Sequence, residues 1–270
     1  MTERTAASSR AADRDAPLAR TGVDAVALKP TECDVARGRD VPVDGVVVDF
    51  EGHDHLPAPS TLRELAAEKS VRVTTPVRAD GFDPLGDDGR LSALPDAVGR
   101  VVVAGNPAYL SETAGDRAVA PRLRAARESD PDAWVGTEGV ERVALAVGGT
   151  QFELLSRSTA RDCRALRAAG FDADLAVYAP TVLCDDDDAV LDALAPYLGR
   201  RRAVRRALPD DPTLSADATG RTREVLLRAA EDFALTGTPE TVADRVADLK
   251  AAGATAVVSY PARGVDAVVD

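Results

Sequence analysis

Short runs of β-branched residues alternate along this chain with longer stretches whose apolar residues have helical spacing, and this alternation limits the folds open to it. Seven strands are predicted, at residues 23–28, 43–49, 71–77, 100–104, 143–147, 173–178 and 254–259. Six helices are predicted between them, at residues 61–69, 117–129, 158–169, 187–198, 222–235 and 239–252. Strands that alternate with helices in this way form βα units around a parallel sheet.

Several predicted strands are apolar along their whole length. Residues 46–48 and 101–103 are each three consecutive valines, and such runs are typical of a sheet that helices cover on both faces. Two α/β architectures fit, an open doubly wound sheet and a closed (β/α)8 barrel. The length of 270 residues favours the TIM-type barrel, which typically takes about 250 residues as one domain.

One strand of this barrel is hard to find. The segment from 116 to 139 should contain it, and only Ala133, Trp134 and Val135 are suitable. We therefore predict a TIM-type (β/α)8 barrel with one strand shortened or missing.

The domain organisation follows from two further patterns. Residues 1–20 contain Ser, Ala, Arg and Asp but no apolar run, which indicates a disordered lead-in rather than a secretion signal. Residues 21–270 contain no linker and no internal repeat, so we expect one barrel domain. No stretch of about 20 apolar residues is present to cross a membrane. A cytoplasmic protein is therefore expected.

Charge limits the partners of the chain. It has 45 Asp and Glu against 33 Lys and Arg, which gives a net charge of −12, and 32 of the acids are Asp. This composition resembles that of proteins from salt-loving, high-GC organisms, and it concerns the solvent rather than the function. The one basic run, residues 200–206, is interpreted as a solvated helix end. Neither nucleic acid nor an anionic membrane is expected as a partner.

In a barrel of βα units the functional site lies where the strands end. The segment after the second predicted strand stands out, because it holds both histidines of the chain, His53 and His55, beside Glu51 and Asp54. Three interpretations stay open. These residues could be metal ligands, a histidine could donate or accept a proton, or the segment could be a solvated loop.

Other strand ends offer further candidates. Lys29 follows the first predicted strand, where it could form a Schiff base or extend to the rim. Gly105, Asn106, Gly148 and Gly149 follow two other predicted strands, and small residues or turns there would let a ligand approach the backbone. The motifs GxGxxG, P-loop, GxSxG and HExxH are absent, so nucleotide-motif and serine-hydrolase functions have no support.

The C-terminal segment carries a family pattern. Residues 232–242 read Asp-Phe-Ala-Leu-Thr-Gly-Thr-Pro-Glu-Thr-Val, and residues 249–254 read Leu-Lys-Ala-Ala-Gly-Ala, before Val257, Val258 and Pro261. In order and spacing these residues resemble the bacterial luciferase-like family of (β/α)8 oxidoreductases, especially its deazaflavin-dependent methylene-tetrahydromethanopterin reductase branch. Upstream, the strand that leads to Asp54 and His55 is similar to the second strand of that family.

The resemblance also covers the fourth predicted strand, with one departure. Residues 99–105 resemble the family's fourth strand and its glycine-rich end, but Gly105, Asn106 and Pro107 stand where the family usually has Gly-x-Gly. The change removes one flexible glycine and one backbone N–H near the cofactor position.

The resemblance implies a flavin- or deazaflavin-dependent oxidoreductase that transfers hydride to or from a small-molecule substrate. It implies the deazaflavin coenzyme F420 or FMN as the cofactor, and a homodimer. We predict His55 and Asp54 as the catalytic, proton-handling or ring-contacting residues. The predicted cofactor-binding residues are Gly105, Asn106, Gly148 and Gly149, and no metal is predicted.

Two other function classes stay open. A luciferase-like barrel without a cofactor could act as a non-catalytic binding or assembly module, and this alternative predicts a barrel mouth filled by side chains. A metal- or lysine-dependent barrel enzyme would instead centre on Glu51, His53, His55 or Lys29.

Overall fold

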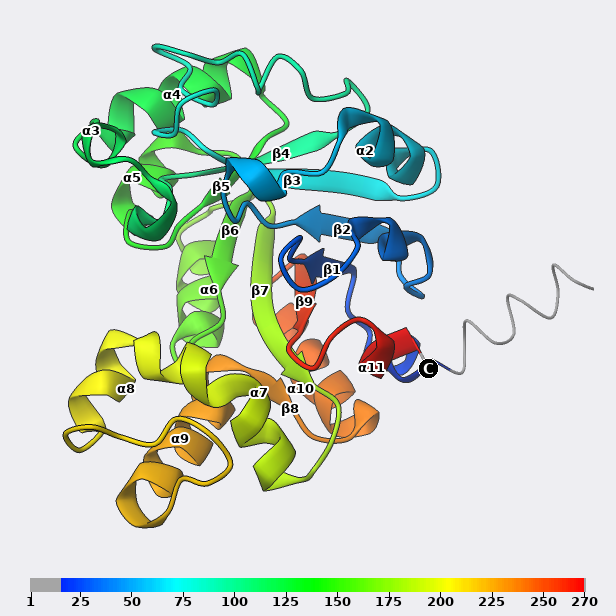
Figure 1. Cartoon of the computed structure of the whole chain (residues 1–270), viewed down its shortest axis with the longest axis vertical. Helices are drawn as coiled ribbons and strands as arrows, with labels where there is room; N and C mark the ends of the chain where they lie inside the picture. Colours follow the sequence, from blue (N-terminus) through cyan, green and yellow to red (C-terminus); the bar gives the residue numbers. More distant parts are fainter. Residues whose placement is uncertain (1–15, 270) are drawn as a thin grey trace, which may run out of the picture.

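Eight parallel strands close into a barrel in the computed structural model, which describes residues 16–269 (Figure 1). In order around the ring the strands are β1 (Ala25–Leu28), β2 (Gly45–Val48), β3 (Ser70–Pro76), β4 (Gly99–Val103), β5 (Trp134–Gly136), β6 (Gln151–Leu154), β7 (Leu175–Val182) and β9 (Ala256–Pro261). The ring closes because β9 pairs with both β7 and β1. The short β8 (Leu235–Thr236) pairs with the end of β7 outside this ring. The predicted TIM-type α/β barrel is confirmed.

Helices surround the ring. The longer ones are α2 (Pro59–Ala66), α4 (Val119–Ser129), α5 (Glu141–Val147), α6 (Thr159–Ala168), α7 (Asp187–Arg200), α8 (Arg202–Ala207), α9 (Gly220–Phe233) and α10 (Pro239–Ala251). Short turns complete the set: α3 (Glu112–Gly115), α11 (Asp266–Val269), η1 (Pro17–Arg20), η2 (Val35–Arg39), η3 (His53–His55) and η4 (Pro107–Tyr109). The six predicted helices are confirmed as α2, α4, α6, α7, α9 and α10, and their ends move by a few residues.

The prediction of a strand at residues 143–147 is wrong, because this segment forms α5. Glu141, Ala144 and Leu145 favour a helix, and Ala144 packs in the apolar cluster under α4. The strand that follows is β6, whose polar Gln151 and Glu153 hid it from a search for apolar runs. The fifth strand that was hard to find exists as β5, with three residues. The other six predicted strands are confirmed.

Most of the predicted N-terminal lead-in, residues 1–15, lies outside the described residues. The last part of it is folded, because Pro17–Arg20 form η1, which packs against α10 and α11 and buries Leu18. None of the described helices is long and apolar enough to span a membrane.

Apolar side chains fill the layers on both sides of the strands. Alternate strand residues, such as Ala27, Val47 and Phe152, form a cluster inside the barrel, and the positions between them pack against the surrounding helices. Helices α7, α8 and α9 have an apolar cluster of their own, with Leu194 and Leu226 fully buried. These three helices form one group at the end of the molecule farthest from α2 and α4 (Figure 1).

Candidate active site

A cavity of about 590 Å³ opens where the barrel strands end. Its lining comes from the ends of the seven strands β1 to β7 and from the end of α7. Cavities of this size hold small organic ligands. The carboxyl ends of the strands are also where barrels of this type carry their active sites.

Apolar and aromatic side chains form part of the cavity wall. Phe152, Leu154 and Val103 line it from the strands. Phe50 and Tyr109 line it near the mouth, where their rings meet edge to face with centroids 6.4 Å apart. Such walls suit a flat ring system, because aromatic faces and edges pack well against planar groups.

Asp49 and Tyr178 form a hydrogen-bonded pair in this cavity. Asp49 directly follows β2, and two-residue alternation places it on the same face as Val47, toward the barrel interior. Tyr178 lies on β7 and donates its hydroxyl hydrogen to Asp49 Oδ2 at 3.0 Å. The two residues are distant in sequence and come together because the ring closes.

The environment of Asp49 shifts its acidity toward neutral pH. Protein encloses the carboxyl group, and this burial raises its pKa from the ordinary 3.8 to about 7. The Tyr178 hydrogen bond and Lys29 oppose the rise, whereas Glu51 and Glu32 add to it. Asp49 keeps partial access to the cavity. Near pH 7 it can therefore both donate and accept a proton there.

A second polar network supports the pair from one side. The Tyr260 hydroxyl donates to Glu32 Oε2 at 2.6 Å, and Lys29 Nζ lies 3.3 Å from Glu32 Oε1. Lys29 Nζ also lies 3.8 Å from the centre of the Tyr260 ring, which stacks on the Tyr178 ring with centroids 6.1 Å apart. Burial and Asp49 raise the pKa of Tyr178 far above its ordinary value, so this hydroxyl remains a hydrogen-bond donor.

Two of the predicted cofactor-binding residues line the cavity, Gly105 and Asn106. The loop that carries them is held in place by Arg78, which donates to the Ala104 carbonyl at 2.7 Å and to the Gly105 carbonyl at 3.0 Å. Asn106 Oδ1 accepts from the Ala108 N–H at 2.9 Å and so caps η4. These hydrogen bonds fix the conformation of the loop at the end of β4, which borders the cavity.

The structure does not bring the other predicted residues to the cavity. His55 and Asp54 are exposed in η3, and neither lines the cavity. Gly148 and Gly149 connect α5 to the start of β6, so they lie at the amino ends of the strands. Their placement at a strand end depended on the incorrect strand at 143–147.

His53 sits in an aromatic cluster beside the mouth. Its ring stacks on Phe82 with centroids 5.9 Å apart and meets Phe50 edge to face at 5.3 Å. Burial and the charge of Arg90 lower the pKa of His53, which favours the neutral ring. Among residues 16–269, no group of three or more His, Cys, Asp or Glu side chains is placed to hold a metal ion.

Sequence reasoning missed the roles of Tyr178 and Tyr260. Their signal was weak, because each is a single aromatic residue inside a mostly apolar strand. Asp49 was visible as the first residue after an apolar strand, but the two histidines nearby drew attention by their rarity.

Comparisons with other proteins identify the family and the fold. Residues 18–268 match a family described as "Family of unknown function (DUF7388)", and the chain belongs to this family. No curated protein has a significantly similar sequence.

The solved structures that are similar to this chain include two at 16% sequence identity each. One is an F420-dependent secondary alcohol dehydrogenase in complex with an F420–acetone adduct, with a TM-score of 0.60 over 92% of this chain and 96% of that chain. The other is apo-MsnO8, with a TM-score of 0.51 over 92% of this chain and 97% of that chain. At this identity the similarity establishes the shared fold.

Proposed function

We propose that this protein is an oxidoreductase that binds F420 or a flavin such as FMN in the cavity and transfers hydride to or from a small-molecule substrate. The observation that carries the proposal is the Asp49–Tyr178 pair, which offers a group with a pKa of about 7 at the edge of an open cavity. The similarity in fold to an F420-dependent alcohol dehydrogenase supports the choice of cofactor class.

The residues around the cavity fit a cofactor of this kind. The volume of about 590 Å³ and the aromatic walls suit a planar heteroaromatic ring. Gly105 has a φ of +92° and lies against Pro76 and Leu110, where a Cβ would come within 3.2 Å of both. The backbone can therefore border the cavity closely at this point. Arg201 also lines the cavity, and its buried Nε has no hydrogen-bond partner among the described residues, so a donor is available to a ligand.

The bound cofactor would supply the hydride chemistry. The chain itself would handle the proton that accompanies hydride transfer at a carbonyl or alcohol carbon. In the reducing direction the protonated Asp49 donates to the carbonyl oxygen, and in the oxidising direction its carboxylate accepts the hydroxyl proton. Tyr178 orients the carboxyl group through its hydrogen bond.

This assignment differs from the prediction that His55 and Asp54 carry the catalysis. Those two residues are exposed outside the cavity lining, whereas Asp49 faces the space where a ligand fits. The alternative of a non-catalytic module predicts a mouth filled by side chains. An open cavity with a carboxyl group of near-neutral pKa favours the enzyme.

Titration of oxidised F420 and of FMN into the purified protein, followed by absorbance and fluorescence, tests the proposal. We expect one of them to bind. Leu154→Trp should fill part of the cavity and weaken that binding at least tenfold, while Leu145→Trp, at an exposed position on α5, should leave it unchanged. Asp49→Asn should retain binding and lower turnover about 100-fold or more. If the wild-type protein binds neither cofactor, the proposal is wrong.

A further inference from the structure

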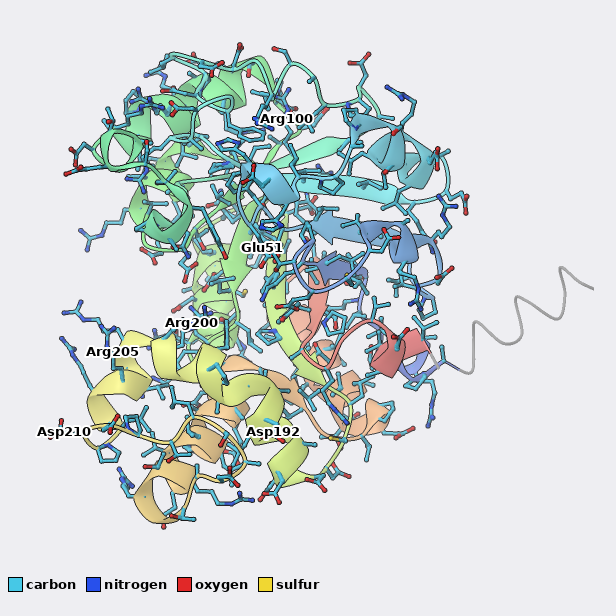
Figure 2. All side chains as sticks on the ribbon, viewed as in Figure 1. Glu51, Arg100, Asp192, Arg200, Arg205 and Asp210 are labelled. Carbon is cyan, nitrogen blue, oxygen red and sulfur yellow. The ribbon has the colours of Figure 1, made fainter. Side chains whose placement is uncertain are left out.

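Five arginines lie within residues 200–206, at the end of α7 and along α8. Leu194 and Leu198 on α7 are fully buried in the cluster that α7 shares with α8 and α9, so the end of α7 is well anchored. Arg200 and Arg201 line the cavity. Figure 2 shows Arg200 at the end of α7 nearest the strands, and Arg205 farther out along α8. The run is therefore more than a solvated helix end.

The two cavity arginines differ in what holds them. Arg201 pairs with Glu138 at 3.1 Å, and its guanidinium carbon lies 4.5 Å from the centre of the Tyr197 ring. Its neighbours thus fix it in place. Arg200 is exposed, and its Nε donates to the Pro196 carbonyl at 3.2 Å. Within residues 16–269 its two Nη groups have neither a hydrogen bond nor an ion pair, so they are available to a ligand.

Most other charges around the cavity are compensated within the protein. Lys29 pairs with Glu32, and Arg201 pairs with Glu138. Burial raises the pKa of Asp49, which reduces the negative charge that its carboxyl group carries near neutral pH.

Two charged groups of the lining remain, the Glu51 carboxylate and the Arg200 guanidinium, and they shift the pKa of Tyr109 in opposite directions. Glu51 accepts hydrogen bonds from the Thr31 N–H and hydroxyl but has no cationic partner among the described residues. Burial raises the pKa of Tyr109, and Glu51 adds to the rise whereas Arg200 opposes it. The cavity is therefore bipolar, with acidic groups toward β1 and β2 and a cation with free donors at the end of α7.

We propose that the substrate is a small organic anion whose carboxylate or phosphate group pairs with Arg200 while its reacting carbon lies toward Asp49. This inference rests on the proposed function, because it names the substrate class of the same site. The two free Nη groups of Arg200 can bind two oxygens of one anionic group. In a chain with a net charge of −12, the neighbouring arginines of α8 would also offset the long-range repulsion of an anion.

Anion binding to the full-length protein without cofactor tests this inference by calorimetry at low ionic strength. Adipate and inorganic phosphate serve as separate anionic probes, and 1,6-hexanediol is the neutral counterpart of adipate. We expect at least one anion to bind, and the tighter of the two identifies carboxylate or phosphate as the preferred group. Arg200→Gln should weaken this binding at least tenfold. Arg200→Lys, which keeps the charge, should recover part of it.

Arg205→Gln is the matched control, since Arg205 is exposed on α8 and does not line the cavity. It should change anion affinity less than twofold. The inference is overturned if neither anion binds the wild-type protein, if hexanediol binds as tightly as adipate, or if both variants weaken binding equally.

Cofactor titrations into Arg200→Gln separate this inference from the proposed function. Unchanged affinity for F420 or FMN, together with weakened anion binding, supports the inference. A tenfold loss of cofactor affinity would show that Arg200 holds the cofactor, which overturns the substrate class and leaves the oxidoreductase proposal standing. If adipate binds through Arg200 and neither cofactor binds the wild-type protein, the anion site stands and the proposed function fails.

Discussion

Asp49 couples the stability of the barrel to pH. Its pKa is about 7 in the folded protein and 3.8 ordinarily. Between these values the native state binds a proton that the unfolded chain has released, so the free energy of unfolding falls as pH rises. One pKa unit corresponds to about 1.4 kcal/mol. The whole shift is therefore worth about 4 kcal/mol, of which about 3 kcal/mol falls between pH 5 and pH 8.

Asp49→Asn removes this titration and isolates its effect. The free energy of unfolding of the variant, relative to wild type, should rise by about 3 kcal/mol from pH 5 to pH 8. Urea unfolding followed by circular dichroism at pH 5, 6, 7 and 8, at constant ionic strength, measures the difference. Leu145→Ala is the control, because Leu145 is exposed and has no titratable group, and its difference from wild type should not vary with pH. Parallel pH dependences for wild type and Asp49→Asn would refute the reasoning.

Two further substitutions test the site and the fold. Tyr178→Phe removes a hydrogen bond that lowers the pKa of Asp49, so that pKa should rise above 7, as an infrared titration of the carboxyl band would show; a fall would contradict the assignment. Gly237→Ala should lower stability by more than about 1 kcal/mol in thermal unfolding, because φ is +121° and the new Cβ would lie 2.9 Å from Thr241. Gly115→Ala, with open space around it, should be nearly neutral.

The barrel could be predicted from the sequence because most of its elements carry strong local signals. The strands β2 and β4 contain continuous valine runs. In α9 and α10 the apolar residues recur with helical spacing over several turns. Thr238 and Pro239 mark the start of α10, where the Thr238 hydroxyl accepts from the Thr241 N–H.

The elements between β4 and α6 could not be predicted from local sequence patterns. The strand β5 has three residues and β6 has four, which is too short for a period to emerge. Gln151 is fully buried, and its amide donates to the Gly149 carbonyl at 3.0 Å. In the sequence, a polar residue that is buried against backbone carbonyls cannot be told from a residue of a polar loop. Val143 and Val147 lie on the buried side of α5. Because β-branched residues are typical of strands, this helical segment looks like a strand in the sequence.

The candidate site was harder to predict than the fold because it depends on contacts between distant residues. Asp49 and Tyr178 are 129 positions apart, and only ring closure places them together. The two histidines were conspicuous in composition, but a rare residue type carries no information about which way its side chain faces. Gly105 and Asn106 were found because the end of β4 was predicted correctly.

The two proposals place chemistry and specificity on different parts of the fold. Tyr178 lies on a strand of the ring and Asp49 directly follows one, and the eight parallel pairings fix the geometry of the ring. Arg200 lies on α7, which packs with α8 and α9 through a separate apolar cluster. Substitutions in α7 or α8 can therefore alter which anion binds without disturbing the carboxyl group that handles the proton, since residues without shared partners act nearly independently. An enzyme built in this way can exchange substrates while it keeps one proton-transfer site.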